Sequence, residues 1–370
     1  MRDKQADTST PSTQTGASKH LSRRSLVMTG AAAVAVSGCA RLEALLTPKE
    51  PPLPGRRVDV LTNSNAVNQL NARSVQNPQI TLSAPIANTE WAQEGSNAAR
   101  VAGNFAFAAK PRRVWSLKAG TGNRRRQQLT SSPLIINKTI FSIDSSGTVT
   151  ARRLSDGQQY WQRSVWPQGE KSGYGGALAY ADGRLHVTAG LDYVVTLDAR
   201  TGKAVWYQRL KSPVRSAPTV ANGLVYLVTL DNQIYCLAAE TGELVWTNSN
   251  TTSVTRLLGG SSLATDGNMV VATLGSGEVQ GLSADKGRLR WEDSLSQVGL
   301  AEAALGEIPD IVTPPAIYQG SVFVTSQTGR SASLDLATGR LRWEASFGSR
   351  SSMAFANKHL FMITSEVKMI

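Results

Sequence analysis

Residues 217–246 read APTVANGLVYLVTLDNQIYCLAAETGELVW, and this stretch decides the fold class. It contains four short apolar runs separated by three turn signals, which are the pairs NG at 222–223, DN at 231–232 and TG at 241–242. Runs rich in Val, Leu and Tyr that are broken by two-residue turns are typical of consecutive antiparallel hairpins. The stretch therefore predicts one four-stranded antiparallel sheet that ends on Trp246.

The same ending, a Gly-containing turn followed by a short strand with a tryptophan, recurs along the chain. The five tryptophans that close such endings are Trp161, Trp206, Trp246, Trp291 and Trp343. Their spacing of 40 to 52 residues, with four strands in each unit, is typical of a β-propeller. The predicted fold class is therefore all-β, a propeller of four-stranded antiparallel blades.

Five complete units and a partial sixth unit are expected. The complete units cover residues 132–161, 177–206, 217–246, 262–291 and 314–343. The sixth starts at Ser352 and reaches Ile370 without the closing turn and tryptophan, so the pattern predicts a propeller that is incomplete at its C-terminus. One or two strands are also expected between residue 88 and residue 117. We interpret the tryptophans, Trp115 included, as structural, because each ring can pack against an adjacent blade.

The first 38 residues have the pattern of an export signal. An arginine pair at 23–24 precedes a short Ala-rich core, and VSGC at 36–39 resembles a bacterial lipobox. Cys39 is therefore the predicted lipidation site. Ala40 follows it where an Asp would favour the inner membrane, so we expect outer-membrane sorting. The export route stays open between the twin-arginine and general pathways. Residues 39–87, rich in Pro and Asn, are expected to form an extended tether.

The repeats LDARTGKAVW, LAAETGELVW and LDLATGRLRW resemble the quinoprotein-type propeller repeat. In front of them stand the lipobox, PPLPGRRVDVL at 51–61 and NTEWAQEGSNAAR at 88–100. This order resembles the BamB family of outer-membrane assembly lipoproteins, in its alphaproteobacterial form, from residue 22 to about residue 365. Members of the family are eight-bladed. The resemblance thus implies a propeller domain over 88–370 that lacks roughly the last two blades.

What the resemblance implies is binding and not catalysis. It implies a periplasmic scaffold of the β-barrel assembly machinery, anchored in the outer membrane by lipid, that aids the folding and insertion of outer membrane proteins. The partners implied are a POTRA domain of the large barrel subunit and unfolded outer membrane proteins.

The family's partner contact lies in two adjacent inter-blade loops, which match TRLLG at 255–259 and DIVTPP at 310–315. The resemblance therefore implies that Arg256, Leu257, Leu258 and Asp310 bind the partner. The arginine precedes the leucines, where the family has it after them, and Val312 stands in place of a second aspartate. From the residues alone, the two leucines can equally begin the inner strand of the next blade.

Two alternatives are a quinone (PQQ)-dependent oxidoreductase and an independent propeller that binds envelope ligands. The enzyme would need calcium held by carboxylate and amide oxygens, a catalytic Asp and usually a disulfide between adjacent cysteines. The chain has only Cys39 and Cys236, three scattered histidines and no GxSxG, HExxH or Walker-type motif. We therefore expect no catalytic residue, no metal and no cofactor, and interpret Cys236 as a small buried hydrophobe.

The 370 residues carry a net charge of +12. This charge is compatible with an anionic membrane surface or an acidic partner, and equally with a need for solubility alone. The triplet Arg124-Arg125-Arg126 has no interleaved aromatic residues, so we interpret it as a solvated loop and expect no nucleic-acid partner. No apolar run reaches 18 residues, so no membrane-spanning helix is expected.

Overall fold

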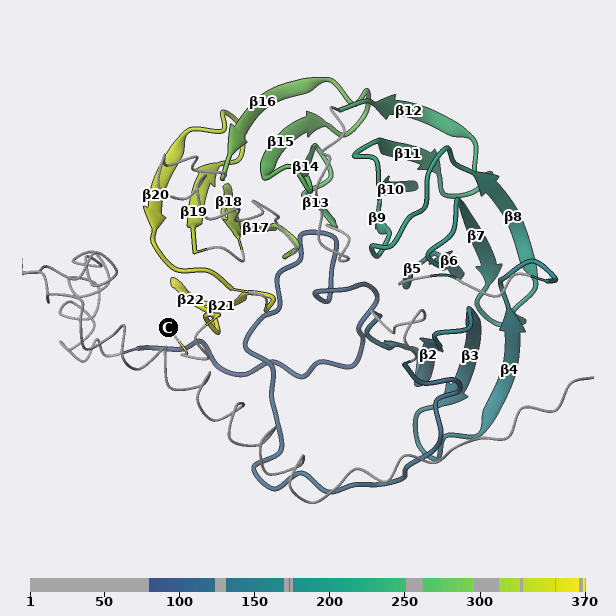
Figure 1. The fold of residues 1–370 in the computed structure, drawn as a ribbon. Coiled ribbons are helices and arrows are strands. Elements are labelled where there is room, and N and C mark those ends of the chain that lie inside the picture. The colour runs from purple at the N-terminus through teal and green to yellow at the C-terminus, as the bar shows by residue number, and fades with distance from the viewer. Residues whose placement is uncertain are drawn as a thin grey trace, which may run out of the picture. The chain divides into compact units, whose positions relative to one another are not determined.

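The structure, a computed structural model, describes residues 80–123, 131–169, 173, 176–250, 262–295, 313–326, 329–349, 351–365 and 369. The regular elements in these ranges are strands, which form five four-stranded antiparallel sheets and one two-stranded sheet. In Figure 1 the sheets follow one another along an arc, with the first strand of each sheet on the inside. The predicted all-β propeller is confirmed. None of the described residues form a helix that could cross a membrane.

Each four-stranded sheet, called blade 1 to blade 5 in chain order, is a meander in which consecutive strands pair. Blade 1 contains β1 (Leu134–Ile136), β2 (Thr139–Ile143), β3 (Thr148–Arg153) and β4 (Gln159–Ser164). Blade 2 contains β5 (Ala177–Ala181), β6 (Arg184–Thr188), β7 (Tyr193–Asp198) and β8 (Ala204–Arg209). Blade 3 contains β9 (Thr219–Ala221), β10 (Leu224–Val228), β11 (Ile234–Ala238) and β12 (Leu244–Asn248).

The remaining sheets continue the same order. Blade 4 contains β13 (Leu263–Thr265), β14 (Met269–Thr273), β15 (Glu278–Ser283) and β16 (Leu289–Ser294). Blade 5 contains β17 (Ala316–Tyr318), β18 (Ser321–Thr325), β19 (Ser331–Asp335) and β20 (Leu341–Ala345). The two-stranded sheet, blade 6, contains β21 (Ala354–Ala356) and β22 (His359–Phe361). The five complete units and the partial sixth expected from the sequence therefore each correspond to one sheet.

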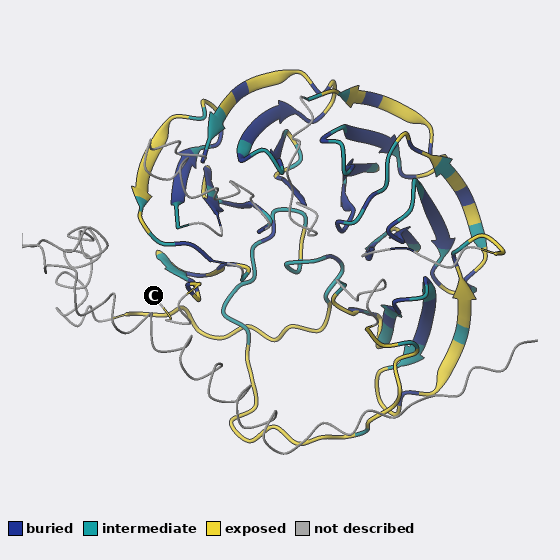
Figure 2. Cartoon of the chain, viewed as in Figure 1, coloured by how far each residue is buried: buried dark blue, intermediate teal, exposed yellow. Residues whose placement is uncertain are grey.

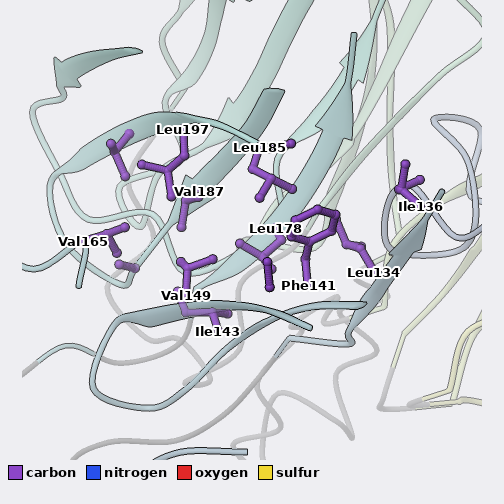
Figure 3. Close-up of a cluster of buried hydrophobic side chains, with 14 residues drawn as sticks. Leu134, Ile136, Phe141, Ile143, Val149, Val165, Leu178, Leu185, Val187 and Leu197 are labelled. Atoms are coloured by element: carbon purple, nitrogen blue, oxygen red, sulfur yellow. The ribbon is translucent and has the colours of Figure 1, made fainter. Parts of the chain in front are cut away.

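Hydrophobic side chains are buried mainly between neighbouring blades. The cluster between blades 1 and 2 joins Phe141 and Val149 of blade 1 to Leu185 and Leu197 of blade 2 (Figure 3). Similar clusters join blades 2 and 3, blades 3 and 4, and blades 4 and 5. Figure 2 shows inner strands that are mostly buried and outer strands that are mostly exposed, with a single buried residue, the tryptophan, in β8, β12 and β16. Stability thus arises from the joints between blades, as expected for sheets packed face to face.

Tryptophans of the outer strands stabilise the contacts between neighbouring blades. The indole Nε1 donates a hydrogen bond to a backbone carbonyl of the next blade at 2.8–3.0 Å in four pairs: Trp161 to Ala199, Trp206 to Ala239, Trp246 to Ala284 and Trp291 to Leu336. At each joint the turn glycine of the next blade lies against the ring. A Cβ on Gly242 would lie 2.6 Å from Trp206, and the φ of +77° also favours glycine. The structural interpretation of these tryptophans is confirmed.

Trp343 and Trp115 occupy the two ends of this series. Trp343 is 38% exposed, because the described part of blade 6 holds only two strands and offers no turn for the indole to bond. Trp115 donates to the carbonyl of Leu154 in blade 1 at 2.9 Å, which is the outer-strand geometry. The expectation of one or two strands before residue 117 is nevertheless wrong. Residues 80–123 contain only isolated bridges, since no described strand lies alongside residues 112–117 to pair with them.

Within a blade, the tryptophan also faces a ring on the second strand across a small residue on the third strand. Ring centroids lie 5.9–6.1 Å apart in four such sets: Phe141–Ala151–Trp161, His186–Thr196–Trp206, Tyr226–Cys236–Trp246 and Phe323–Ser333–Trp343. Blade 4 has Val271, Gly281 and Trp291 at these positions. Cys236 is fully buried, which confirms its interpretation as a small core residue, and burial raises the pKa of its thiol to about 12.

The strands run between two faces of the blades. One face, called the connection face, carries the turns between second and third strands and the connections from each outer strand to the next inner strand. Backbone bonds join these two kinds of loop, as between Leu210 and Asp192 at 2.7 Å and between Leu295 and Gly277 at 2.9 Å. The opposite face, called the turn face, carries the remaining turns of each blade. Any surface formed by inter-blade connections therefore lies on the connection face.

Candidate functional site

The sequence predicts partner-binding residues in two connections of the connection face, one between β12 and β13 and the other between β16 and β17. The predicted residues Arg256, Leu257, Leu258 and Asp310 lie outside the described residues, as does the predicted lipidation site Cys39. What the structure describes is the base of each connection, where the chain leaves one blade and enters the next. These bases define the candidate functional site.

A segment from the N-terminal part of the chain supports the inner strand of every blade. Residues 86–105, called the central segment, pass along the inside of the arc (Figure 1). Backbone amides of five inner strands donate to this segment at 2.8–3.1 Å through Ile135, Tyr180, Thr265, Ile317 and Phe355. In blade 3, the amide of Val220 donates to the Gln93 side chain at 2.9 Å. One short segment thus fixes all six blades.

The central segment holds the end of the first connection through a charge pair whose arginine is buried. Ser262, the first described residue after that connection, donates its hydroxyl to Glu94 Oε2 at 3.0 Å. Glu94 in turn forms a 3.0 Å ion pair with Arg100, whose side chain is only 3% exposed. Arg100 also donates to the carbonyl of Leu263 at 3.0 Å and to Thr219 Oγ1 at 2.9 Å. Arg100 therefore joins blade 3 to blade 4 at the point where the first connection ends.

Burial dominates the electrostatics of this pair. Desolvation lowers the pKa of Arg100, and the negative charge of Glu94 partly opposes that effect. A buried guanidinium is tolerated when its donors are matched by acceptors, and here a carboxylate, a hydroxyl and two carbonyls accept from it. The pair is consequently a fixed structural element.

The start of the first connection is held by amide side chains. Asn250 donates through Nδ2 to the carbonyl of Asn232 at 3.0 Å, and its Oδ1 accepts from Gln280 Nε2 at 2.8 Å. Gln280 Nε2 also donates to Glu292 Oε2 at 3.1 Å. Because Asn232 belongs to blade 3 and Gln280 to blade 4, this network joins the same two blades as Arg100 does. Both ends of the connection are therefore held in fixed positions.

The second connection has a comparable base between blades 4 and 5. Arg330 donates to the carbonyl of Ser294 at 2.8 Å and pairs with Glu344 at 2.6 Å, at the end where the connection begins. At its other end Thr313 is buried and donates its hydroxyl to the carbonyl of Ser349 at 3.0 Å. Two neighbouring connections thus leave the connection face from two rigid joints.

The chemistry that these residues offer is hydrogen bonding. Across the described ranges, no three His, Cys, Asp or Glu side chains are grouped so as to hold a metal ion. His186 and Cys236 are both fully buried inside blades, away from the bases. The residues do not fit a quinone cofactor with calcium on the inside of the arc, because the central segment lies there and the inner strands already bond to it. The described residues suit a binding surface.

Sequence reasoning missed the role of the central segment, although the stretch NTEWAQEGSNAAR was noted for its resemblance. The usable signal in the sequence was the pair Gly95-Ser96, which is typical of a turn and stands between Glu94 and Arg100. The structure confirms the turn, with positive φ values of +72° at Gly95, +80° at Ser96 and +60° at Arg100. A turn between a glutamate and an arginine six positions later favours an ion pair between the two. The acceptors on Leu263 and Thr219 could not be read from the sequence.

The fold and the site define a β-propeller of quinoprotein-like repeats in which polar side chains hold the bases of two neighbouring inter-blade connections. A family model described as outer membrane protein assembly factor BamB matches residues 163–369. That match covers more than half of the chain, and the chain belongs to this family.

Relatives of the same description agree. The proteins of Escherichia coli (strain K12) and Salmonella typhimurium are each 28% identical to this chain, over 68% of this chain and 65% of their own length. The protein of Moranella endobia is 23% identical, over 70% of this chain and 69% of its own length. The chain thus spans about two thirds of the length of the relatives that it matches.

Solved structures show the fold. The crystal structure of BamB from Moraxella catarrhalis superimposes with a TM-score of 0.54 at 20% identity, covering 62% of this chain and 68% of that one. A europium-containing methanol dehydrogenase superimposes with a TM-score of 0.56 at 16% identity, covering 69% of this chain and 58% of the enzyme. The same fold thus serves an assembly factor and a dehydrogenase, and fold likeness alone does not decide between them.

Proposed function

We propose that this chain is a non-catalytic scaffold of the β-barrel assembly machinery that acts at the periplasmic face of the outer membrane. It binds a POTRA domain of the large barrel subunit and so aids the folding and insertion of outer membrane proteins. Family membership supports this role, because the matched relatives are named as outer membrane protein assembly factors. Cys39 carries the lipid anchor, and residues 39–87 are the tether.

The observation that carries the proposal is the pair of rigid bases on the connection face. The ion pair of buried Arg100 with half-buried Glu94 and the Asn250 network fix both ends of the first connection, and Arg330 and Thr313 fix the second. Partners bind more tightly to surfaces that are already ordered, because less conformational entropy is lost on association. Two adjacent, firmly based connections are suited to hold one folded domain.

In this proposal, Arg256 and Asp310 form hydrogen bonds at the rim of the contact, and Leu257 and Leu258 supply its apolar centre. Interfaces combine a desolvated apolar core with a polar rim in this way, and arginine is enriched among residues whose truncation weakens binding. The partner's surface is expected to offer a carboxylate to Arg256 and a cation to Asp310.

The test is affinity capture of the large barrel subunit from detergent-solubilised envelopes, with partners identified by mass. The double variant Arg256→Ala/Asp310→Ala should reduce capture at least tenfold, since truncating interface residues of this kind costs about 1–2 kcal/mol each. A matched control, Arg200→Ala/Asp285→Ala, removes one exposed charge of each sign from turns of the turn face and should leave capture unchanged. Undiminished capture by the first variant, with a native circular dichroism spectrum, would refute the assignment of these residues.

A further inference from the structure

One buried amide interrupts the apolar packing between blades 3 and 4. Gln280 in β15 precedes Gly281, whose partner on the outer strand is Trp291. In blades 2, 3 and 5 the residues at the register of Gln280 are Val195, Tyr235 and Ala332. These three belong to the apolar clusters between their own blade and the preceding one. Gln280 therefore places a polar group, only 3% exposed, where the repeat packs apolar side chains.

The surrounding hydrogen bonds fix the orientation of this amide. Its Nε2 donates to Asn250 Oδ1 at 2.8 Å and to Glu292 Oε2 at 3.1 Å, which uses both of its hydrogens. Asn250 is itself oriented, because its Nδ2 donates to the carbonyl of Asn232 at 3.0 Å. Exchanging the nitrogen and the oxygen of Gln280 would place an acceptor against two other acceptors. The two amide side chains thus have one favourable arrangement.

This arrangement costs stability. Gln280 Oε1 is buried and has no hydrogen-bond partner among the residues that the structure describes. A buried acceptor without a hydrogen bond destabilises the folded chain. An apolar residue at this position, such as the valine of blade 2, would avoid that cost. The observations therefore favour a role for Gln280 in holding Asn250 in place over a role in stability.

Asn250 is the last described residue before the first connection. It is half-buried, and its carbonyl accepts from Gln233 Nε2 at 3.5 Å. In the connection between β8 and β9, backbone amides do this work, because Leu210 and Val214 donate to carbonyls of the turn between β6 and β7. The start of the first connection is instead held by side-chain amides of blades 3 and 4.

We infer that Gln280 is a positioning residue: through Asn250, it sets the direction in which the first connection leaves blade 3. The inference deepens the proposed function and rests on it for the identity of the partner, because this connection carries Arg256, Leu257 and Leu258. A connection that starts from a less ordered position loses more conformational entropy when it binds. Gln280 can thus affect partner affinity without touching the partner.

The experiment measures capture of the large barrel subunit by the full chain, together with stability in urea. Gln280→Val should raise the concentration of chain at half-maximal capture about tenfold. The midpoint of urea denaturation should not fall, because exposed Glu292 and half-buried Asn250 can bond to water instead. The control Thr150→Val lies at the same register of blade 1 and should leave capture unchanged.

A second set of variants tests whether Gln280 acts through Asn250. Asn250→Ala and the double variant Gln280→Val/Asn250→Ala should each weaken capture about tenfold, like Gln280→Val alone, because either change breaks the same link. Losses that multiply to about a hundredfold in the double variant would show two independent effects and would overturn the inference.

A measurement without the partner separates this inference from the proposed function. Trypsin cuts after basic residues, and Arg256 in the first connection and Lys171 in the connection between β4 and β5 each offer a site. Gln280→Val should speed cleavage after Arg256 about threefold and leave cleavage after Lys171 unchanged, because proteolysis follows local opening.

The outcomes are distinct. A wild-type chain that captures no barrel subunit would refute the proposed function alone; faster cleavage after Arg256 in Gln280→Val would then still support the positioning role. Equal cleavage after Arg256 in the two proteins would overturn the inference. Undiminished capture by Gln280→Val would do the same, as would a loss of capture matched by a fall in the urea midpoint, since that result would make the role of Gln280 structural.

Discussion

Mild acid should destabilise the propeller through one side chain, His186. This histidine is fully buried in β6, its Nδ1 lies 2.7 Å from Thr196 Oγ1, and its ring centroid lies 5.9 Å from that of Trp206. Its Nε2 atom has no hydrogen-bond partner among the residues that the structure describes. Burial, reinforced by the nearby positive charge of Arg184, lowers the pKa of His186 from 6.5 to about 4. The folded chain therefore holds this ring in its neutral form.

The sign of the effect follows from the two pKa values. The unfolded chain takes up a proton at His186 as the pH falls through 6.5, whereas the folded chain does so only near pH 4. The stability that depends on neutral His186 is thus complete above pH 6.5 and is lost as the pH falls towards 4. Each pH unit within this window costs about 1.4 kcal/mol, so the free energy of unfolding should fall by about 3 kcal/mol in total.

The assay is urea denaturation followed by tryptophan fluorescence at a series of pH values across this window. The matched variant is His186→Phe, because Phe141 and Phe323 fill the same register position in blades 1 and 5. Other groups with lowered pKa values, such as Asp198 and Asp335, titrate in both proteins and cancel in the difference. Two pH profiles that stay parallel from pH 6.5 to pH 4 would refute the reasoning.

Two further predictions concern packing. Arg100→Met should lower the free energy of unfolding by about 3–5 kcal/mol, because Glu94 and the acceptors of two blades lose a buried donor. Thermal denaturation measures this, and a loss under about 1 kcal/mol would show that the pair is dispensable. Gly281→Ala should cost about 1–3 kcal/mol, because the added Cβ would overlap the ring of Trp291. Ser333→Ala at the same register of blade 5 is the control and should be nearly neutral, and equal losses in the two variants would contradict the packing argument.

The repeat architecture could be predicted because its signals are local. A turn glycine and a tryptophan mark the end of each unit within a few residues, and the apolar runs between turns mark the strands. The burial of Cys236 was predictable for the same reason, since it stands within an unbroken apolar run. The Trp–carbonyl bonds between blades then follow from the repetition of one unit along the chain.

The parts that could not be predicted depend on distant residues. Gln93 and Glu94 look like residues of a polar loop, because their partners Val220 and Ser262 are more than 120 positions away in the sequence. Residues 112–117 have the sequence pattern of an outer strand, and for this reason a strand was expected there. A strand also requires hydrogen bonds to a neighbouring strand, and a local sequence pattern does not show whether that neighbouring strand is present. The partner-binding residues Arg256, Leu257, Leu258 and Asp310 stay predictions for the capture experiment.

The central segment has a consequence for the order of folding. Its residues are synthesised before every inner strand that they contact, and those contacts follow in chain order from Ile135 in blade 1 to Phe355 in blade 6. Each blade can form early from adjacent hairpins, whereas each contact with the segment closes a loop, from 44 residues at Trp91–Ile135 to 253 at Ala102–Phe355. Closing the longest loop costs only about 1.5 kcal/mol more than closing the shortest. The central segment therefore acts as a template: each inner strand binds to it in chain order, and the position of each blade in the propeller follows from the residue of the segment that it contacts.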